Sequence, residues 1–194
     1  MTIAEALRPY IAKRHLAIFY DLALVIGGSI FVALAARIAI PLPFTPVPIT
    51  GQTLAVLLVG AVLGSKRGAL SMLLYLLEGA AGLPVFAGGT GSLHRLLGPT
   101  GGYLFGFVAA AFVTGWLAER QWDRRFWSNF LAMLIGNIVI YLFGLPWLAR
   151  FVGVERVLPL GLYPFIPGDL VKLVIATLSL PSVWKLIGGD RSFA

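Results

Sequence analysis

The chain has 194 residues, of which 59% are hydrophobic and only 12% are charged. A soluble domain carries about 25% charged residues, so this chain cannot cover a globule with charge, and we expect its solvent to be lipid. The absence of cysteine excludes disulfides, a thiolate metal site and a cysteine nucleophile. A net charge of +7 would suit nucleic acid, but the mean hydropathy of +0.91 indicates instead a membrane protein whose basic residues mark its cytosolic loops.

Apolar runs along the chain predict six transmembrane helices, since a span needs about 20 mostly apolar residues. In chain order the predicted helices cover residues 19–40, 50–63, 68–83, 101–118, 126–148 and 168–186. Several charges precede the first apolar run, which argues against a cleavable signal. We therefore expect an all-α integral membrane protein, with one transmembrane domain over residues 1–194 and a short cytosolic segment over residues 1–18.

The connections between these helices are of two kinds that alternate along the chain. One kind and the two termini are basic, and they carry Arg8, Lys13, Arg14, Lys66, Arg67, Arg120, Arg124, Arg125, Lys185 and Arg191. The other kind is rich in proline and glycine and carries Arg95, Arg150 and Arg156, with Arg37 at a helix end. The positive-inside rule then places both termini in the cytosol and the loops rich in proline and glycine outside.

Asp169 and Lys172 lie three residues apart at the start of the sixth predicted helix, so they share a helix face. An ionisable group in hydrocarbon costs at least ~2.5 kcal/mol, so one interpretation is an internal ion pair that lets both charges enter the membrane. The other is a ligand site, because a carboxylate accepts N–H donors and an ammonium binds anionic groups. A resting pair that a ligand splits would satisfy both interpretations.

Residues 84–103 form a glycine-rich outer loop that contains Phe86 and Arg95 and ends at Tyr103. Glycine lets a backbone approach a ligand closely, although a tight loop without a ligand is the alternative. The sequence lacks the P-loop pattern G-x-x-x-x-G-K-[ST], so we expect no ATP site and no cofactor in this chain. Two histidines and no cysteine likewise predict no metal site.

Several further polar residues fall at a similar depth of the predicted bundle, which favours a shared cavity over exposure to lipid. They are Gln52, Glu78, Asn137 and Tyr141, and Tyr75 lies one turn before Glu78. Each also has a structural alternative. Glu78 could be a counter-ion of Arg37 or Lys172, and the others could simply form hydrogen bonds between helices.

Ala35 and Ala39 have the small-x-x-x-small spacing that allows two helices to approach closely. The face that they share on the first predicted helix could pack within the bundle. It could equally dock on a partner membrane protein, and the spacing does not separate the two interpretations.

Four segments, taken in order, resemble the BioY family, the substrate-capturing S component of energy-coupling-factor (ECF) biotin transporters. They are PLPFTPVPITGQTL (41–54), LLYLLEGAAGLPVFAGG (73–89), GPTGGYLFGF (98–107) and PGDLVK (167–172). Together they extend from the end of the first predicted helix into the sixth. Residues 1–18 and the turn between the fourth and fifth helices lie outside the resemblance.

The resemblance implies a six-helix bundle in the bacterial plasma membrane, with a biotin site that opens outward beneath the first outer loop. Asp169 would accept hydrogen bonds from the ureido N–H groups, and Lys172 or Arg95 would pair with the carboxylate, or these roles would be exchanged. Aromatic packing on the bicyclic ring would come from Tyr75, Phe86 and Tyr103. Secondary contacts would come from Thr50, Gln52, Glu78 and Asn137.

The resemblance also implies partners. Ala35 and Ala39 would dock on a transmembrane coupling subunit, with two ATP-binding subunits below it. One rival is an S component for another vitamin, which would keep the fold and partners but change the pocket. The other is a membrane enzyme that uses Glu78 and Asp169 as a carboxylate pair. The cation of Lys172 would keep Asp169 ionised and make it a poor acid, so we expect a capture protein and not an enzyme.

Overall fold

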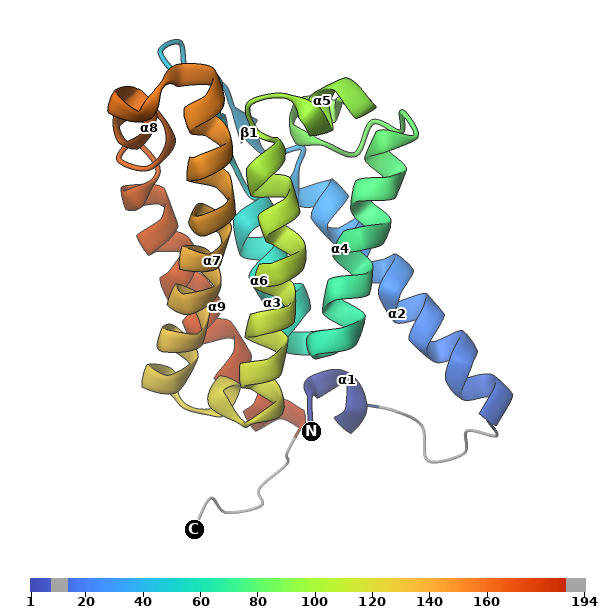
Figure 1. The fold of residues 1–194 in the computed structure, drawn as a ribbon. Helices are drawn as coiled ribbons and strands as arrows, with labels where there is room; N and C mark the ends of the chain where they lie inside the picture. The colour runs from blue at the N-terminus through green and yellow to red at the C-terminus, as the bar shows by residue number, and fades with distance from the viewer. Residues whose placement is uncertain (8–13, 188–194) are drawn as a thin grey trace.

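The computed structural model describes residues 1–7 and 14–187, which are mostly helical (Figure 1). Six long helices coincide with the predicted ones to within five residues at each end. Their bounds are α2 Arg14–Ala35, α3 Gln52–Leu63, α4 Ser65–Ala80, α6 Gly101–Glu119, α7 Phe126–Val152 and α9 Ile166–Ile187. The apolar runs of the sequence therefore become the long helices of the structure.

Four helical segments are long and apolar enough to cross a membrane, namely residues 17–35 of α2 together with α6, α7 and α9. Helix α3 has 12 residues and α4 has 16, which at 1.5 Å per residue gives lengths of about 18 and 24 Å. Both are shorter than the ~30 Å hydrocarbon core of a bilayer. The fold is thus that of a multi-pass membrane protein with four candidate spans, and the count of six spans stays a prediction.

The helix predicted over 19–40 is wrong at both ends. Helix α2 begins at Arg14, inside the segment predicted to precede the membrane, and it stops at Ala35. Beyond it, β1 (Ala39–Ile40) pairs antiparallel with β2 (Ile49–Thr50). The prolines that follow Ile40 cannot continue a helix, so the backbone here forms a short hairpin in a fold that is otherwise mostly helical, as predicted. Other short elements lie outside the predicted helices: α1 Ile3–Ala6, η1 Ala87–Gly89, α5 Leu93–Leu97, η2 Trp122–Arg124 and α8 Val154–Gly161.

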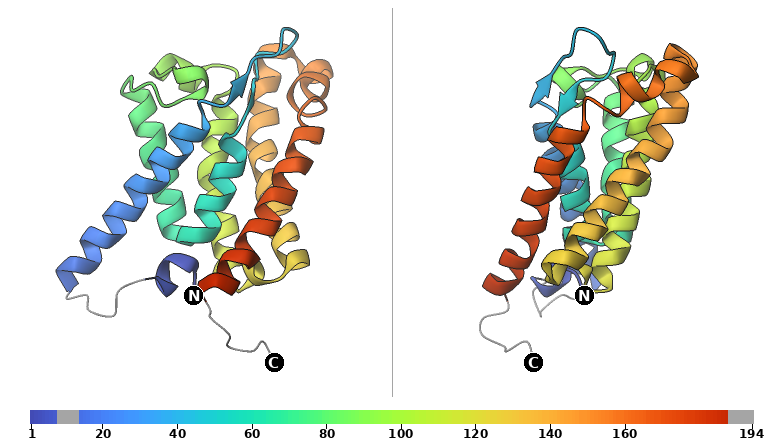
Figure 2. Two further views of the ribbon diagram at one scale, coloured as in Figure 1. Left: turned by 180° about the vertical axis from the view of Figure 1, so that it is seen from behind. Right: turned by 90° about the vertical axis from the view of Figure 1, so that its left-hand side faces the viewer.

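The two ends of the bundle differ in what covers them. The β1–β2 hairpin, α5 and α8 gather at one end, which we call the hairpin end, and α1 lies at the other (Figure 1). Helix α6 packs against α3, α4 and α7, whereas α2 diverges from the bundle away from the hairpin end (Figures 1 and 2). There the Tyr20 hydroxyl donates to the Ala4 carbonyl at 2.9 Å, and Arg67 pairs with Asp21 at 2.9 Å. These two contacts hold the diverging half of α2.

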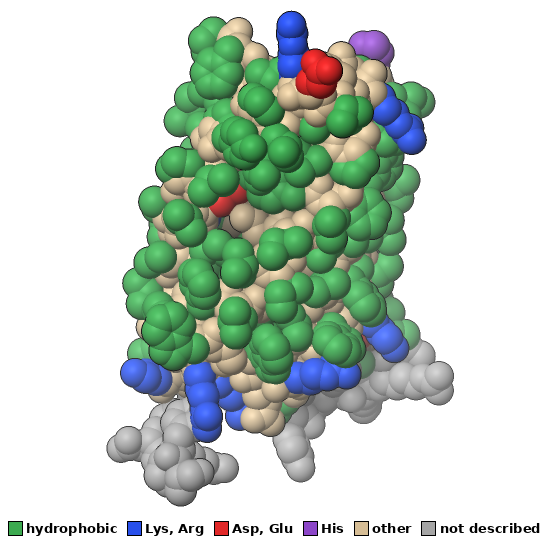
Figure 3. All heavy atoms as spheres, turned by 60° about the vertical axis from the view of Figure 1, so that its left-hand side comes forward, with side chains coloured by type: hydrophobic (Ala, Val, Ile, Leu, Met, Phe, Trp, Pro, Cys, Tyr) green, Lys and Arg blue, Asp and Glu red, His purple; other side chains and the backbone are tan. Residues whose placement is uncertain are grey.

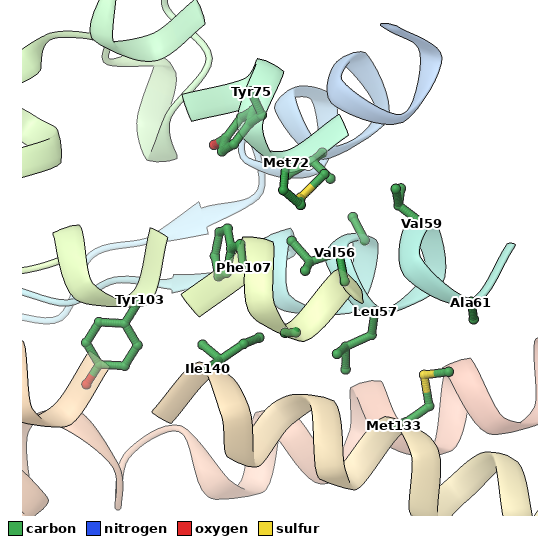
Figure 4. Close-up of a cluster of buried hydrophobic side chains, with 14 of the residues drawn as sticks. Val56, Leu57, Val59, Ala61, Met72, Tyr75, Tyr103, Phe107, Met133 and Ile140 are labelled. Atoms are coloured by element: carbon green, nitrogen blue, oxygen red, sulfur yellow. The ribbon is translucent and has the colours of Figure 1, made fainter. Parts of the chain in front are cut away.

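The core lies where α3, α4, α6 and α7 meet, and large apolar side chains from all four helices fill it (Figure 4). Small residues set how closely these helices approach. A Cβ added to Gly60 of α3 would lie 2.5 Å from the Ala111 carbonyl oxygen of α6, so only glycine fits this crossing. Since lipid provides no hydrophobic drive between helices, such close packing is a main source of association energy.

Charge also distinguishes the two ends of the bundle. Lysine and arginine side chains line the lower rim of the molecule beneath a broad apolar belt (Figure 3). We call this the basic end, and its described cations lie at the start of α4, between α6 and α7, and in the last turn of α9: Lys66, Arg67, Arg120, Arg124, Arg125 and Lys185. Arg8, Lys13 and Arg191, which entered the predicted charge asymmetry, lie outside the described residues. Arg14 opens α2.

A buried carboxyl fixes helix α9 at the basic end. Asp123 in η2 is 1% exposed, and one of its oxygens accepts a hydrogen bond from the Trp184 indole N–H of α9. Its other oxygen has no partner within residues 1–7 and 14–187. Burial raises the pKa of Asp123, and the hydrogen bond from Trp184 and the nearby Arg124 guanidinium offset only part of that rise.

We expect Asp123 to lower stability as pH rises. Below about pH 4 the carboxyl is protonated in both the folded and the unfolded chain and carries no penalty. As pH rises through the raised native pKa, the unfolded chain ionises more readily, so the free energy of unfolding falls. Asp123→Asn keeps an acceptor for Trp184 and should raise the unfolding midpoint at neutral pH and flatten its dependence on pH. Thermal unfolding in detergent between pH 4 and 8 measures this, and identical profiles for both proteins would contradict it.

Candidate functional site

A cavity of about 340 Å³ opens at the hairpin end of the bundle. Segments far apart in the sequence line it: the β1–β2 hairpin and its loop, the starts of α3, α6 and α9, the loop before α5, and the middle of α7. Its lining residues include Ala39, Thr45, Thr50, Gln52, Thr53, Phe86, Arg95, Tyr103, Phe107, Ile140, Tyr141, Phe165, Asp169 and Lys172. Because α3 begins only at Gln52, the space above its first turn is left open to form this cavity.

A chain of hydrogen bonds crosses the cavity wall from α7 through α9 to α3. The Tyr141 hydroxyl donates to one carboxylate oxygen of Asp169. The Lys172 ammonium lies 3.2 Å from the other oxygen and donates to the Thr53 hydroxyl at 2.9 Å. The side chains of Asp169 and Lys172 are only 7% and 17% exposed. The predicted pair is therefore a desolvated ion pair that faces a cavity, which agrees with both sequence interpretations.

This chain of bonds leaves capacity for a ligand. An ammonium has three N–H donors, and Lys172 uses two of them on Asp169 and Thr53. Helices α3, α6 and α9 also begin at the cavity, and the N-terminal end of a helix carries partial positive charge. The cavity can therefore bind a group that accepts hydrogen bonds or carries negative charge.

Arg95 gives the cavity mouth a second cation. It lies in α5, whose first turn is capped by the Ser92 hydroxyl accepting from the Arg95 backbone N–H at 3.1 Å. Its side chain is exposed and makes no ion pair within the described part of the chain. One carboxylate and two cations line the cavity, so its net charge suits a monoanion.

Tyr75 supports the cavity from behind and does not line it. It is fully buried, its hydroxyl donates to the Val85 carbonyl at 2.9 Å, and it accepts from the Gln52 amide at 2.5 Å. The Phe86 ring packs edge-on against it, with ring centroids 5.4 Å apart. Gln52 and Phe86, which do line the cavity, are thus held in place by Tyr75, and Gln52 keeps one N–H and its carbonyl for a ligand.

Tyr103 forms another part of the wall and is equally constrained. Its hydroxyl donates to the Gly161 carbonyl at 2.9 Å, and its ring packs edge-on against Tyr141. A Cβ added to Gly144 of α7 would lie 2.4 Å from this ring, so glycine is needed there for the ring to fit. Thr50 of β2 also lines the cavity, and its hydroxyl accepts from the Gln52 backbone N–H at 3.3 Å.

The loop between β1 and β2 covers the cavity and is tied to α8. The Thr45 hydroxyl donates to the Leu160 carbonyl at 2.7 Å, and Thr45 is 9% exposed. Arg37 ties a second covering segment, since it donates to the Pro84 carbonyl at 2.9 Å. These bonds hold two loops over the cavity without contacts from a ligand.

Two predicted site residues lie elsewhere. Glu78 accepts a hydrogen bond from Ser29 of α2, so it pairs with neither Arg37 nor Lys172. It does not line the cavity, which means that the Glu78 and Asp169 carboxylates are not brought together as an enzyme would require. Asn137 lines a separate crevice between α7 and α9.

The small-residue pair also differs from its prediction. Ala35 is the last residue of α2 and Ala39 belongs to β1, so the two do not share a helix face. Ala35 packs against Gly51, and Ala39 lines the cavity. These contacts do not test whether Ala35 and Ala39 dock on a partner, so that role stays a prediction.

The sequence reasoning missed Thr45 and Thr53. Threonines are common in membrane helices and loops, and only the tertiary contact with Leu160 or Lys172 distinguishes these two. Within the two described ranges, no three His, Asp or Glu side chains lie close enough to hold a metal ion. The arrangement is suited to reversible binding of a small amphipathic anion.

Comparison with known proteins gives consistent results. A model of the BioY family matches residues 10–189. The biotin transporter BioY of Rhizobium etli is 45% identical over 159 residues, which cover 78% of this chain and 85% of the relative. That of Thermotoga maritima is 43% identical over 164 residues, which cover 83% and 95%. The crystal structure of the S-component for biotin from an ECF-type ABC transporter is similar, with a TM-score of 0.74 at 25% identity over 90% of this chain and 95% of that one.

We expect that removing one charge of the buried pair destabilises the protein more than removing both. Lys172→Met leaves the Asp169 carboxylate without its cation, and breaking a buried pair in this way costs on the order of 3–5 kcal/mol. The double variant Asp169→Leu/Lys172→Met removes both charges and should recover most of the loss. Thermal unfolding in detergent followed by tryptophan fluorescence compares the three proteins. A double variant no more stable than Lys172→Met would contradict the pairing.

Proposed function

The chain belongs to the BioY family, and from that premise we propose that it captures biotin and takes it up across the membrane as the S component of an ECF transporter. It is a transport protein and not an enzyme. The observation that carries this function is the buried Asp169–Lys172 pair on the wall of an otherwise largely apolar cavity, with the exposed Arg95 at its mouth. Pockets for small molecules have this composition, mainly apolar with a few convergent polar groups.

The chemistry of biotin matches this cavity group by group. Its bicyclic ring is apolar and would lie against Phe86 and Tyr103. Its ureido group has two N–H donors and one acceptor, which suit a carboxylate beside an ammonium. Its carboxylate gives the ligand a single negative charge, which balances the net charge of the lining side chains.

We propose that the ureido ring lies deep and the carboxylate lies at the mouth. The Asp169–Lys172 pair is desolvated, and a neutral ureido group can be buried there once its donors and acceptor are paired. Arg95 is exposed, so a carboxylate can bind it without losing all of its water. Thr50 and Gln52 would add contacts within the cavity. Glu78 and Asn137 would act only indirectly, because neither lines it.

For the transport machinery, we propose a transmembrane coupling subunit and two ATP-binding subunits as partners. The sequence has no P-loop pattern, so the chain would bring no nucleotide site or cofactor of its own, and the partners would supply the energy of ATP. We also propose that Ala35 and Ala39 dock on the coupling subunit, although the two do not share a helix face. Lipid is the remaining partner, and nucleic acid has no place in this function.

For the topology, we propose six spans in one transmembrane domain over residues 1–194, within the bacterial plasma membrane. The short helices α3 and α4 would then cross a locally thinner section or share their span with the loops that cover the cavity. The charge of the basic end favours the cytosol by the positive-inside rule. Both described chain ends lie at that end (Figure 1), so the cavity would open outward.

We expect full-length protein in detergent to bind biotin tightly, and Arg95→Gln to weaken binding by about tenfold. Charge-assisted hydrogen bonds contribute roughly 1.5–3 kcal/mol, which corresponds to about 10- to 100-fold in Kd. Asp169→Asn and Thr53→Val should therefore weaken binding as well, the first more than the second because Asp169 is the more buried. Isothermal titration calorimetry measures all three.

Arg156→Gln is the matched control, because Arg156 is an exposed cation of the same end that does not line the cavity. It should bind biotin like the unmodified protein. If folded protein binds no biotin, the ligand is wrong, and other vitamins become the candidates. If Arg95→Gln and Arg156→Gln behave alike, Arg95 does not bind the carboxylate.

We expect Thr45→Val to release biotin several-fold faster. Valine has the shape of threonine but cannot donate to the Leu160 carbonyl, so the covering loop loses its tie to α8. Changes of this kind act mainly on the dissociation rate. A chase of labelled biotin with excess unlabelled biotin measures that rate, and an unchanged unfolding midpoint would show that the fold is intact. An unchanged dissociation rate would mean that another contact holds the loop.

A further inference from the structure

A second hollow lies on the side of the molecule, between α7 and α9. It has a volume of about 170 Å³. Apart from Asn137, Tyr141 and Asp169, every residue that lines it is leucine or isoleucine: Leu134, Ile138, Leu162, Ile166, Leu170 and Leu173. Figure 3, which brings the side of α7 and α9 forward, shows an apolar lateral face with a hollow at mid-height and an acidic side chain beside it. We call this hollow the lateral crevice.

The rim of the lateral crevice faces the membrane. Ile138, Ile166 and Leu170 are 48%, 43% and 51% exposed, and both helices that carry them are long and apolar enough to span a bilayer. Hydrocarbon is therefore the solvent at this rim. An unfilled apolar hollow forfeits dispersion contacts on its walls, so a flexible hydrocarbon chain gains contacts by entering it.

The lateral crevice and the ligand cavity share one wall. Tyr141 and Asp169 line both spaces, and the hydrogen bond from the Tyr141 hydroxyl to the Asp169 carboxylate closes the partition between them. On the cavity side Asp169 meets Lys172. On the crevice side, the other lining residues are Asn137, Tyr141 and the six leucine and isoleucine side chains. Whatever fills the lateral crevice therefore sets how much water reaches the back of Asp169.

We propose that an acyl chain of a membrane phospholipid occupies the lateral crevice and forms the outer backing of the Asp169–Tyr141 wall. The chain excludes water from the carboxylate, and a charge interaction is stronger where water is excluded. It also keeps the Tyr141 ring from moving outward. The effect on biotin rests on the proposed function, whereas the occupancy of the crevice does not.

Photolabelling tests the occupancy directly. The full chain is placed in phosphatidylcholine vesicles in which a small fraction of the lipid carries a diazirine on one acyl chain, and labelled residues are mapped after irradiation. We expect several-fold more label on Ile138 and Leu170 than on Leu142 and Leu178. The latter two are 65% and 56% exposed on the same helices but lie outside the crevice.

A filling substitution tests the same point. Leu170→Trp should occupy the lateral crevice with its own side chain and reduce the label on Ile138 to the level of Leu142. Leu178→Trp adds the same ring to an exposed site of α9 outside the crevice and should leave the label on Ile138 unchanged. Equal labelling of all four positions, or label on Ile138 that Leu170→Trp does not reduce, would overturn the proposal.

The biotin dissociation rate tests the functional consequence. For the unmodified protein we expect release to be several-fold faster in digitonin, which has a rigid steroid ring system and no acyl chain, than in phosphatidylcholine nanodiscs. Leu170→Trp should remove this difference and Leu178→Trp should keep it. A difference that persists in Leu170→Trp would overturn the backing role.

Added biotin separates this proposal from an extended ligand site. Saturating biotin should leave the label on Ile138 in place, whereas loss of the label would assign the lateral crevice to the ligand and overturn its assignment to lipid. If the protein binds no biotin at all, the proposed function fails, and photolabelling still decides whether an acyl chain occupies the crevice.

Discussion

The cost of placing charge in hydrocarbon governs this structure. Asp169 and Lys172 are tolerated inside a membrane fold because they neutralise each other and because Tyr141 and Thr53 complete their hydrogen bonds. Those partners come from α7 and α3, so the pair fixes the first turns of α9, at the hairpin end, against two other helices. The same pair leaves donors and lone pairs facing the cavity. The hydrogen bonds that offset the desolvation of the two charges therefore also build a site that can bind a polar ligand.

The backbone around the pair follows from the same constraint. Helix α3 begins only at Gln52. Tyr103, Phe86 and the covering loops wall the open space between its first turn and the hairpin end. Tyr75, Gly144 and Gly161 take no part in the cavity surface, yet they fix the side chains that do. At the opposite end, the Asp123–Trp184 bond anchors α9. Helix α9 is thus held by polar contacts at both ends, and the lateral crevice lies beside the first of them, at Asp169.

Particular residues show how far sequence reasoning reached. Seven of the predicted ligand residues line one cavity: Thr50, Gln52, Phe86, Arg95, Tyr103, Asp169 and Lys172. Glu78 was predicted from its depth along a helix and Tyr75 from the family resemblance, and neither argument specifies the direction of a side chain around the helix axis. Tyr75 lies behind the wall, and Glu78 turns toward α2. The prediction for Ala35 and Ala39 assumed that one helix continues through both residues. Helix α2 instead ends at Ala35, and the prolines after Ile40 favour a hairpin.

The sequence by itself determined the solvent of this protein, the positions of its long helices and its family. Those properties depend on the composition of contiguous segments and on local motifs, and each segment can be interpreted without knowledge of its tertiary contacts. Tertiary structure alone decided which polar groups meet, since Thr53 lies 119 residues from Lys172 and Thr45 lies 115 residues from Leu160. It also decided where hollows remain, because a cavity is the space that packed helices leave between them, and no single segment encodes that space.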